Sequence, residues 1–269
     1  MPHRDKNWIG QPAARESSVR GLVADGMSAL DHLAAIVPAD HPGDRLEALR
    51  QRVAGRIMFT TSFGLEDQAM THLIAERKLA IDVATLDTGR LFPSTYALWA
   101  ETEQKYGLRI RSFHPDHEAL GTFVADQGIN GFYRSRDARQ ACCNIRKVEP
   151  LNRALAGAGA WVTGLRADQS GERAAVELES WDERRELIKF APLFDWTRRQ
   201  VAEFCAAERV PVNVLHAEGF VSIGCEPCTR AIVPGEPERA GRWWWENDQS
   251  PECGLHVGAD GRLGRRKVA

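Results

Sequence analysis

The first part of the chain alternates between short apolar runs and longer segments with helical periodicity. Apolar side chains recur at helical spacing over residues 22–37, and Pro38 would end that helix. A second helix is expected over residues 43–53. Residues 56–63 form a β-branched and aromatic run typical of a buried strand, and the helical pattern returns over residues 64–79. This order predicts a strand, a tight turn and a helix.

The alternation continues along the chain. Further strands are expected at residues 81–89 and 109–115 and at the start of 160–170, with a strand or loop at 189–197. Helices are expected at residues 94–107 and 198–210. Strands that alternate with helices imply a parallel sheet with helices on both faces, so we expect an α/β fold.

Composition divides the chain into three parts. Residues 1–20 are polar and lack apolar periodicity, so we expect a mobile N-terminal arm. Residues 21–210 hold the predicted α/β domain. Residues 211–269 are richer in glycine, proline and cysteine and have little regular period, so we expect an appended loop-rich segment.

Overall charge and hydropathy exclude several classes of protein. The 269 residues include 35 basic and 37 acidic side chains, and the formal net charge of −2 disfavours binding of nucleic acid through bulk charge. No apolar run approaches the roughly 18 residues that a membrane span requires. The basic N-terminus has no apolar core of a secretory signal. We therefore expect a cytoplasmic protein with no nucleic-acid or membrane partner.

Two turns lie at the carboxyl ends of predicted strands. Ser62 and Gly64 precede the helix that contains Asp67, and backbone N–H groups at such a helix start can face an anion. Ser62 and Asp67 would also fit simple helix caps. Residues 87–89, Asp-Thr-Gly, end the next strand at the edge where open α/β sheets bind ligands, although they would also fit an ordinary turn. The absence of Walker A and GxGxxG patterns disfavours ordinary P-loop and dinucleotide sites.

The cysteines indicate metal or redox chemistry. All six lie in the second half, at positions 142, 143, 205, 225, 228 and 253. In a reducing compartment such cysteines are ligands or redox groups more often than disulfides. Two pairs, Cys142-Cys143 and Cys225-x-x-Cys228, match the ligand set of an iron–sulfur cluster or a structural zinc. Adjacent cysteines suit the several corners of a cubane better than one small ion, which favours a [4Fe-4S] cluster; a structural zinc and four reduced core thiols are the alternatives.

The other two cysteines have different surroundings. Cys253 lies in a turn-rich segment three residues before His256, and nearby cations or hydrogen-bond donors would make it a nucleophile. It would also fit an incidental surface thiol. Cys205 lies inside an apolar helical pattern and is expected in the core.

Basic and aromatic residues gather near these landmarks. Convergent arginines and lysines suit a small polyanion, although each alone is more often a surface charge. They are Arg146, Lys147, Arg166, Arg239 and Arg242. Residues 243–245, three tryptophans, would fit a stacking or docking element, but a packed hydrophobic edge is favoured.

Seven motifs in order resemble one family closely. They are SFGLED, LDTGRLF, ACCNIRKVEP, GLRADQS, GCEPCTR, RAGRWWWE and ECGLH, spread from about residue 50 to residue 256. The chain resembles the assimilatory adenylyl-sulfate reductases, the iron–sulfur branch of the APS/PAPS reductase family. The resemblance implies an adenine-nucleotide α-hydrolase-like fold with a modified PP-loop, adenosine 5′-phosphosulfate (APS) as substrate, thioredoxin or a glutaredoxin-like dithiol as reductant, and a homo-oligomer.

The resemblance also implies roles for single residues. Cys142, Cys143, Cys225 and Cys228 would ligate one [4Fe-4S] cluster per subunit. Cys253, Lys147 and His256 would be catalytic, with Cys253 as the nucleophile. Ser62, Phe63, Gly64 and Asp67 would form the PP-loop, and Leu86, Thr88 and Gly89 would border the adenosine. Lys147, Arg166, Arg239, Arg242 and His256 would surround the phosphosulfate.

The implied reaction belongs to sulfate assimilation and cysteine biosynthesis. Cys253 would attack the sulfate sulfur, AMP would leave, and a second thiol would release sulfite from the enzyme S-sulfonate. The two cysteine pairs favour APS, while dual use of APS and its 3′-phosphorylated form PAPS stays open. A PP-loop ATP pyrophosphatase is disfavoured by Phe63 and by the ECGLH motif. An iron–sulfur sensor would leave Cys253 and the arginines unexplained.

Overall fold

The computed structural model describes residues 41–246 and 254–256. These residues belong to one compact unit of the chain. The helix expected over residues 22–37, the arm expected over 1–20 and most of the C-terminal ending lie outside the described residues. A boundary near residue 210 stays a prediction.

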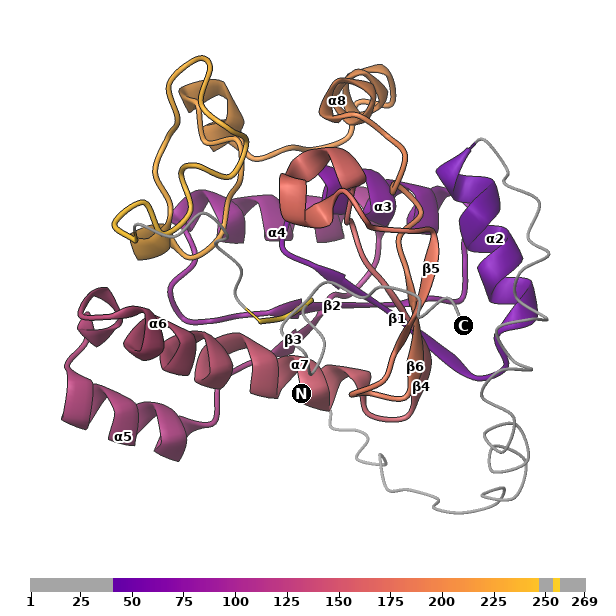
Figure 1. Cartoon of the computed structure of the whole chain (residues 1–269). Coiled ribbons are helices and arrows are strands. Elements are labelled where there is room, and N and C mark those ends of the chain that lie inside the picture. Colours follow the sequence, from indigo (N-terminus) through magenta and orange to yellow (C-terminus); the bar gives the residue numbers. More distant parts are fainter. Residues whose placement is uncertain (1–40, 247–253, 257–269) are drawn as a thin grey trace, which may run out of the picture. The chain divides into compact units, whose positions relative to one another are not determined.

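A six-stranded sheet is the framework of this unit (Figure 1). Its strands are β1 (Arg56–Thr61), β2 (Asp82–Leu86), β3 (Arg111–Phe113), β4 (Ala158–Val162), β5 (Glu179–Asp182) and β6 (Leu187–Phe190). Their order is β3-β2-β1-β4-β6-β5. Five strands run parallel, and β5 pairs antiparallel with β6 at one edge. The expected α/β sheet is confirmed.

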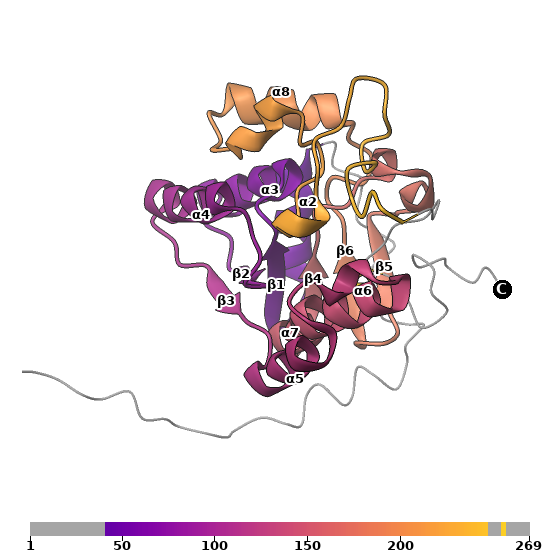
Figure 2. The same cartoon turned by 90° about the vertical axis from the view of Figure 1, so that its left-hand side faces the viewer.

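Helices cover both faces of the sheet, as the alternating pattern predicts (Figure 2). On one side lie α2 (Pro42–Arg52), α3 (Leu65–Glu76), α4 (Pro93–Tyr106) and α8 (Arg198–Ala207). On the other lie α5 (His117–Gln127), α6 (Arg136–Cys143) and α7 (Glu149–Leu155). Within the described residues, no helix is both long and apolar enough to cross a lipid bilayer.

The sequence pattern missed several elements for identifiable reasons. Helix α5 buries only Phe123, so it has no apolar stripe to reveal it. Helices α6 and α7 are joined by a π-helical turn, Asn144–Val148, which breaks the ordinary 3.6-residue period. Strand β5 has one large apolar side chain, Trp181, and it is 37% exposed. These elements are positioned by tertiary contacts that local periodicity does not encode.

The order in which strands are added to the sheet changes side at β1. The chain builds β1, β2 and β3 outward on one side, then returns to place β4 on the other side of β1. Loops that leave adjacent strands to opposite sides open a crevice at the carboxyl ends of those strands. The topology therefore places a ligand crevice beside the residues that follow β1 and β4.

A buried ion pair ties α2 to the segment after β6. Arg45, only 1% exposed, donates to both carboxylate oxygens of Asp195 at 2.6 and 2.7 Å and to the carbonyl of Pro192 at 2.7 Å. The Asp195 side chain is 42% exposed. Loss of Asp195 would remove a carboxylate from beside a buried cation, whereas loss of Arg45 would leave a carboxylate that water can reach.

This asymmetry gives a stability prediction. Asp195→Ala should lower the free energy of unfolding by about 2–4 kcal/mol, and Arg45→Met by less. Urea unfolding of both variants and the parent chain measures the two losses. Equal losses, or a larger loss in Arg45→Met, would contradict the assigned burial of the guanidinium charge.

Candidate active site

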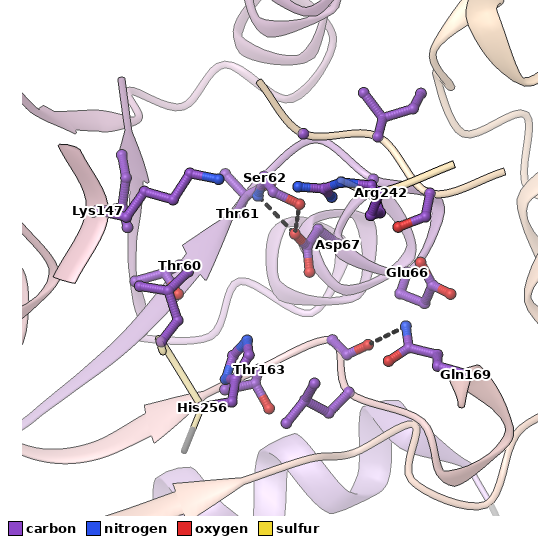
Figure 3. A pocket seen from close by; sticks show the side chains of 18 of the residues that line it. Thr60, Thr61, Ser62, Glu66, Asp67, Lys147, Thr163, Gln169, Arg242 and His256 are labelled. Atoms are coloured by element: carbon purple, nitrogen blue, oxygen red, sulfur yellow. Dashed lines mark hydrogen bonds between the residues drawn. The ribbon is translucent and has the colours of Figure 1, made fainter. Parts of the chain in front are cut away.

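A pocket opens at the carboxyl ends of β1, β2 and β4, where the topology predicts a crevice (Figure 3). Ser62 follows β1, Thr88 follows β2 and Thr163 follows β4. The predicted site residues that line it are Ser62, Gly64, Asp67, Leu86, Thr88, Lys147, Arg239, Arg242 and His256. The structure therefore brings together residues from both halves of the chain.

The turn after β1 leaves the start of α3 available to an anion. Phe63 has a left-handed backbone with φ of 59°, its ring is buried, and it stacks on Trp99 with 5.6 Å between ring centroids. The N–H of Phe63 donates to Thr61 Oγ1 at 3.0 Å. Gly64 is the N-cap of α3 and supplies no side-chain cap; the Glu66 carboxylate accepts from its own backbone N–H, and the neighbouring N–H groups of the first turn can face a ligand.

Asp67, in the first turn of α3, stabilises the turn after β1 through its side chain. Its carboxylate accepts hydrogen bonds from the Ser62 backbone N–H at 2.6 Å and from Ser62 Oγ at 2.7 Å (Figure 3). Burial raises the pKa of Asp67 to about 6, although both bonds from Ser62 act in the opposite direction. Gly164 makes room for this carboxylate, because a Cβ there would lie 2.3 Å from Asp67 Oδ1. Ser62 and Asp67 thus bind each other rather than cap α3.

Arg166 organises the wall of the pocket. It is fully buried, and it donates to Glu66 at 2.8 Å and to both carboxylate oxygens of Glu238 at 2.8 and 3.0 Å. Burial alone would raise the pKa of Glu66, but the Arg166 charge and the hydrogen bonds that the carboxylate accepts together outweigh it and lower that pKa. The two glutamates line the pocket, and Arg166 lies behind them. Sequence motifs pointed to the arginine but not to its partners.

Four cationic side chains line the same pocket: Lys147, Arg173, Arg239 and Arg242. Arg242 is 7% exposed, and its guanidinium lies 4.8 Å from the centre of the Trp243 ring. A Cβ at Gly224 would lie 2.2 Å from Arg242 Nη2, so this guanidinium occupies the space beside that glycine. Arg173 was missed because nothing in its sequence surroundings marks it. A set of convergent cations favours an anionic ligand.

Four cysteines from two distant segments share one buried cluster. Cys142 and Cys143 end α6. Cys225 precedes the short 3₁₀ turn Glu226–Cys228, which Cys228 ends, and all four cysteines pack with Phe123, Phe132 and Trp243. Cys225 also lines the pocket, and its Sγ lies 3.3 Å from Thr88 Oγ1. Cys205 is buried on α8, as expected for a core thiol. Trp243 is buried too, which fits a packed edge, whereas Trp244 is 43% exposed.

The surroundings favour the thiolate of Cys225 but not those of Cys142 and Cys228, since burial raises the pKa of Cys228 to about 11. Burial alone would raise the pKa of Cys225, but Lys147, the hydrogen bond with Thr88 and Arg242 together lower it. Burial raises the pKa of Cys142, and Arg146 opposes that rise. In the described part of the chain, no group of three or more His, Cys, Asp or Glu side chains is arranged as a finished metal site. The four buried thiols are compatible with an iron–sulfur cluster in their number, softness and charged neighbours.

Two residues that the motifs suggested, Arg146 and Gly89, do not line the pocket but stabilise the loop after β2. The Arg146 side chain extends from the π-helical turn, and it donates a hydrogen bond to the Thr88 carbonyl at 2.5 Å. Gly89 has a left-handed backbone with φ of 67°, and a Cβ there would lie 3.7 Å from Arg146. Both residues therefore fix the loop that follows β2.

The segment Gly254–His256 lies against the pocket. The His256 ring is stacked on Trp161, and its carbonyl accepts a hydrogen bond from Lys189 Nζ at 3.1 Å. Burial and the charges of Lys189, Arg173 and Arg239 hold the pKa of His256 well below its usual range, so the imidazole is neutral near pH 7. Cys253, the predicted nucleophile, lies outside the described residues. Neither Trp161 nor Lys189 carried a sequence signal.

The fold and the pocket define an α/β protein with an anion-binding crevice beside a cluster of four buried thiols. The phosphoadenosine phosphosulfate reductase domain matches residues 56–231. The chain therefore belongs to the phosphoadenosine phosphosulfate reductase family.

Individual relatives agree with this assignment. An Agrobacterium fabrum protein named adenosine 5′-phosphosulfate reductase is 55% identical over 205 residues, which cover 76% of this chain and 79% of the relative. A protein of the same name from Allochromatium vinosum is 51% identical over 213 residues, covering 78% of this chain and 83% of the relative. The crystal structure of phosphoadenylyl-sulfate reductase from Candida auris, a phosphate complex, superposes with a TM-score of 0.65 at 27% identity and covers 76% of this chain and 98% of that one.

The raised pKa of Asp67 predicts a pH-dependent contribution to stability. In the unfolded chain this carboxyl has a pKa near 3.8, and in the fold about 6, so the folded state binds the extra proton between these values. Stability from this group is therefore present at low pH and is lost as the pH rises through 6, by about 3 kcal/mol in all. Asp67→Asn carries a neutral analogue of this carboxyl. Its free energy of unfolding, relative to that of the parent chain, should rise by about that amount between pH 4 and pH 7.

Urea unfolding of both proteins at the two pH values measures the change, and the difference between them cancels all other titrations. A constant difference between parent and variant would show that Asp67 titrates normally.

Proposed function

We propose that this protein reduces APS to sulfite and AMP, using electrons from a protein dithiol, in assimilatory sulfate reduction. The observation that carries the proposal is the pocket itself, where the open start of α3, four cations and the segment that follows Cys253 meet. The names of the relatives from Agrobacterium fabrum and Allochromatium vinosum support the same substrate.

The nucleotide would enter at the carboxyl ends of β1 and β2. Ser62, Phe63, Gly64 and Asp67 would shape the PP-loop, whose free N–H groups suit a phosphate or sulfate oxygen. Leu86 and Thr88 line the pocket from β2 and would border the adenosine. The pocket thus has an anionic-ligand end and a more apolar end.

Cys253 would act as the nucleophile. Its thiolate sulfur would form a bond to the sulfate sulfur while the bond from that sulfur to the phosphate oxygen breaks, and AMP would leave with the electron pair. Lys147, Arg239 and Arg242 would stabilise the charge that grows on the leaving oxygen. A thiolate of thioredoxin or a glutaredoxin-like protein would then attack Cys253 Sγ and release sulfite, leaving a mixed disulfide that its second thiol resolves.

His256 would serve this reaction as a neutral group. A neutral imidazole offers one N–H donor and one acceptor nitrogen, whereas a cation would be repelled by Lys189 and Arg173. We therefore assign His256 a hydrogen bond to the phosphosulfate and assign charge neutralisation to the lysine and arginines.

Cys142, Cys143, Cys225 and Cys228 would hold one [4Fe-4S] cluster. When bound, such a group supplies a fixed local field and a rigid link between the two cysteine segments. Lys147 follows Cys143 within the π-helical turn, so the position of that turn sets the position of the lysine in the pocket. The need for free thiols also supports the cytoplasm as the compartment.

The direct test gives anaerobically purified protein APS or PAPS with thioredoxin and measures sulfite. We expect clear preference for APS. In the same assay, Cys253→Ser should lose turnover by at least about a thousandfold while its iron content stays that of the parent, because the nucleophile is not a cluster ligand.

Equal use of both nucleotides would replace the proposal with a dual-specificity reductase. Protein that contains its iron and yields no sulfite from either would refute the reductase assignment and favour the sensor or an ATP-dependent enzyme.

Gly224 tests the role of Arg242. In Gly224→Ala the new methyl group would displace the Arg242 guanidinium, which has little room to move between that glycine and Trp243. We expect kcat/KM for APS to fall about ten- to a hundredfold, as for loss of one charge-stabilising group.

Gly171→Ala is the matched control, because a Cβ at Gly171 meets no atom within 4 Å. Similar kcat/KM in both variants would show that Arg242 does not act on the substrate.

A further inference from the structure

Three contacts of different kinds hold the segment Gly254–His256 against the pocket wall. The ring of His256 lies parallel to the Trp161 indole, with 5.2 Å between ring centroids and 10° between the ring planes. Lys189 Nζ donates to the His256 carbonyl at 3.1 Å. Leu255 packs against the apolar cluster that contains Trp161. These contacts fix a short stretch of chain relative to β4 and β6.

The indole that receives His256 is itself held firmly. Trp161 lies on β4 with 1% of its surface exposed, and its Nε1 donates to Thr60 Oγ1 on β1 at 2.8 Å. The charged groups of Arg185 and Lys189 lie 5.3 and 5.4 Å from the centre of an indole ring. Because these contacts come from β1, β4 and the β5–β6 hairpin, the indole is a fixed platform.

Gly254, two residues before His256, has a backbone conformation that few other residues adopt. Gly254 has φ of 83°, in the left-handed region that favours glycine. A residue with a side chain rarely adopts this conformation, so Gly254 helps to set the path of the chain that carries His256.

We propose that Trp161 is a positioning residue: by stacking on His256 it holds the His256 imidazole in the pocket, where that ring can hydrogen-bond to the phosphosulfate of the substrate. The inference rests on the proposed function for its catalytic consequence. The stack itself needs no substrate. The neutral state of His256 agrees with it, because a protonated ring would be repelled by the cations around Trp161.

The first arm of the test detects the stack by NMR in the full-length, iron-containing protein labelled on histidine. A ring stacked on an indole has upfield-shifted protons, and the His256 signal is identified by its loss in His256→Phe. We expect Trp161→Leu to return this signal to the ordinary histidine position and Trp161→Phe, which keeps a flat ring, to retain part of the shift. Trp181→Leu, on the edge strand β5 of the same sheet, is the matched control and should leave the shift unchanged.

The second arm measures kcat and KM for APS in the same variants. Loss of positioning predicts a kcat at least tenfold lower in Trp161→Leu with KM within about twofold, partial rescue in Trp161→Phe, and parent values in Trp181→Leu. A raised KM with an unchanged His256 signal would overturn the proposal, because Trp161 would then contact the nucleotide itself. An ordinary His256 signal in the parent protein would also overturn it.

Two further results separate this inference from the proposed function. An upfield His256 signal that depends on Trp161, in protein that yields no sulfite from APS, would refute the reductase function and leave the stack standing. If Trp161→Leu does not fold, Lys189→Met removes the bond to the His256 carbonyl without opening the core, and Lys189→Arg should restore it. A parent-like His256 shift and kcat in Lys189→Met would count against the positioning of this segment.

Discussion

The guanidinium of Arg166 lies out of contact with water, and a charge in that position must be balanced by carboxylates. Its partners come from separate parts of the chain: Glu66 from the first turn of α3 and Glu238 from the C-terminal third. One buried cation thus joins the turn after β1, the turn after β4 and the loop that supplies Arg239 and Arg242. Both carboxylates line the pocket, so the same interaction sets the shape of its wall and the charge that surrounds an entering anion.

A second constraint couples the buried thiols to the pocket. Thr88 contacts Cys225 through its hydroxyl and receives Arg146 at its carbonyl, while Cys142 and Cys143 precede the π-helical turn that carries Arg146 and Lys147. Any group bound by the four cysteines would therefore act on the loop after β2 and on Lys147 together. In the proposed reaction, a cluster held by these cysteines would therefore act through placement and local field.

Local patterns predicted the parallel strands and their flanking helices because β1 and α3 have strong, uninterrupted periods. They missed α5 and β5, whose exposed side chains have no period, and α6–α7, whose period is broken at Asn144–Val148. The family resemblance pointed to part of the pocket lining, such as Ser62, Thr88 and Arg242, because the motifs that carry it are short stretches of sequence. They could not reveal that Arg166 is neutralised by Glu66 and Glu238, or that Trp161 receives His256, since these contacts join residues about 70 to 100 positions apart.

The central claim is that Cys253 takes the sulfonate group from the nucleotide before any reductant acts. Mass spectrometry of intact protein after incubation with APS, without thioredoxin or any other thiol, tests this step alone. The account predicts one added SO₃ group per chain, located on the peptide that contains Cys253 and removed by a dithiol with release of sulfite. Release of AMP without an adduct, or an adduct on another cysteine, would contradict it.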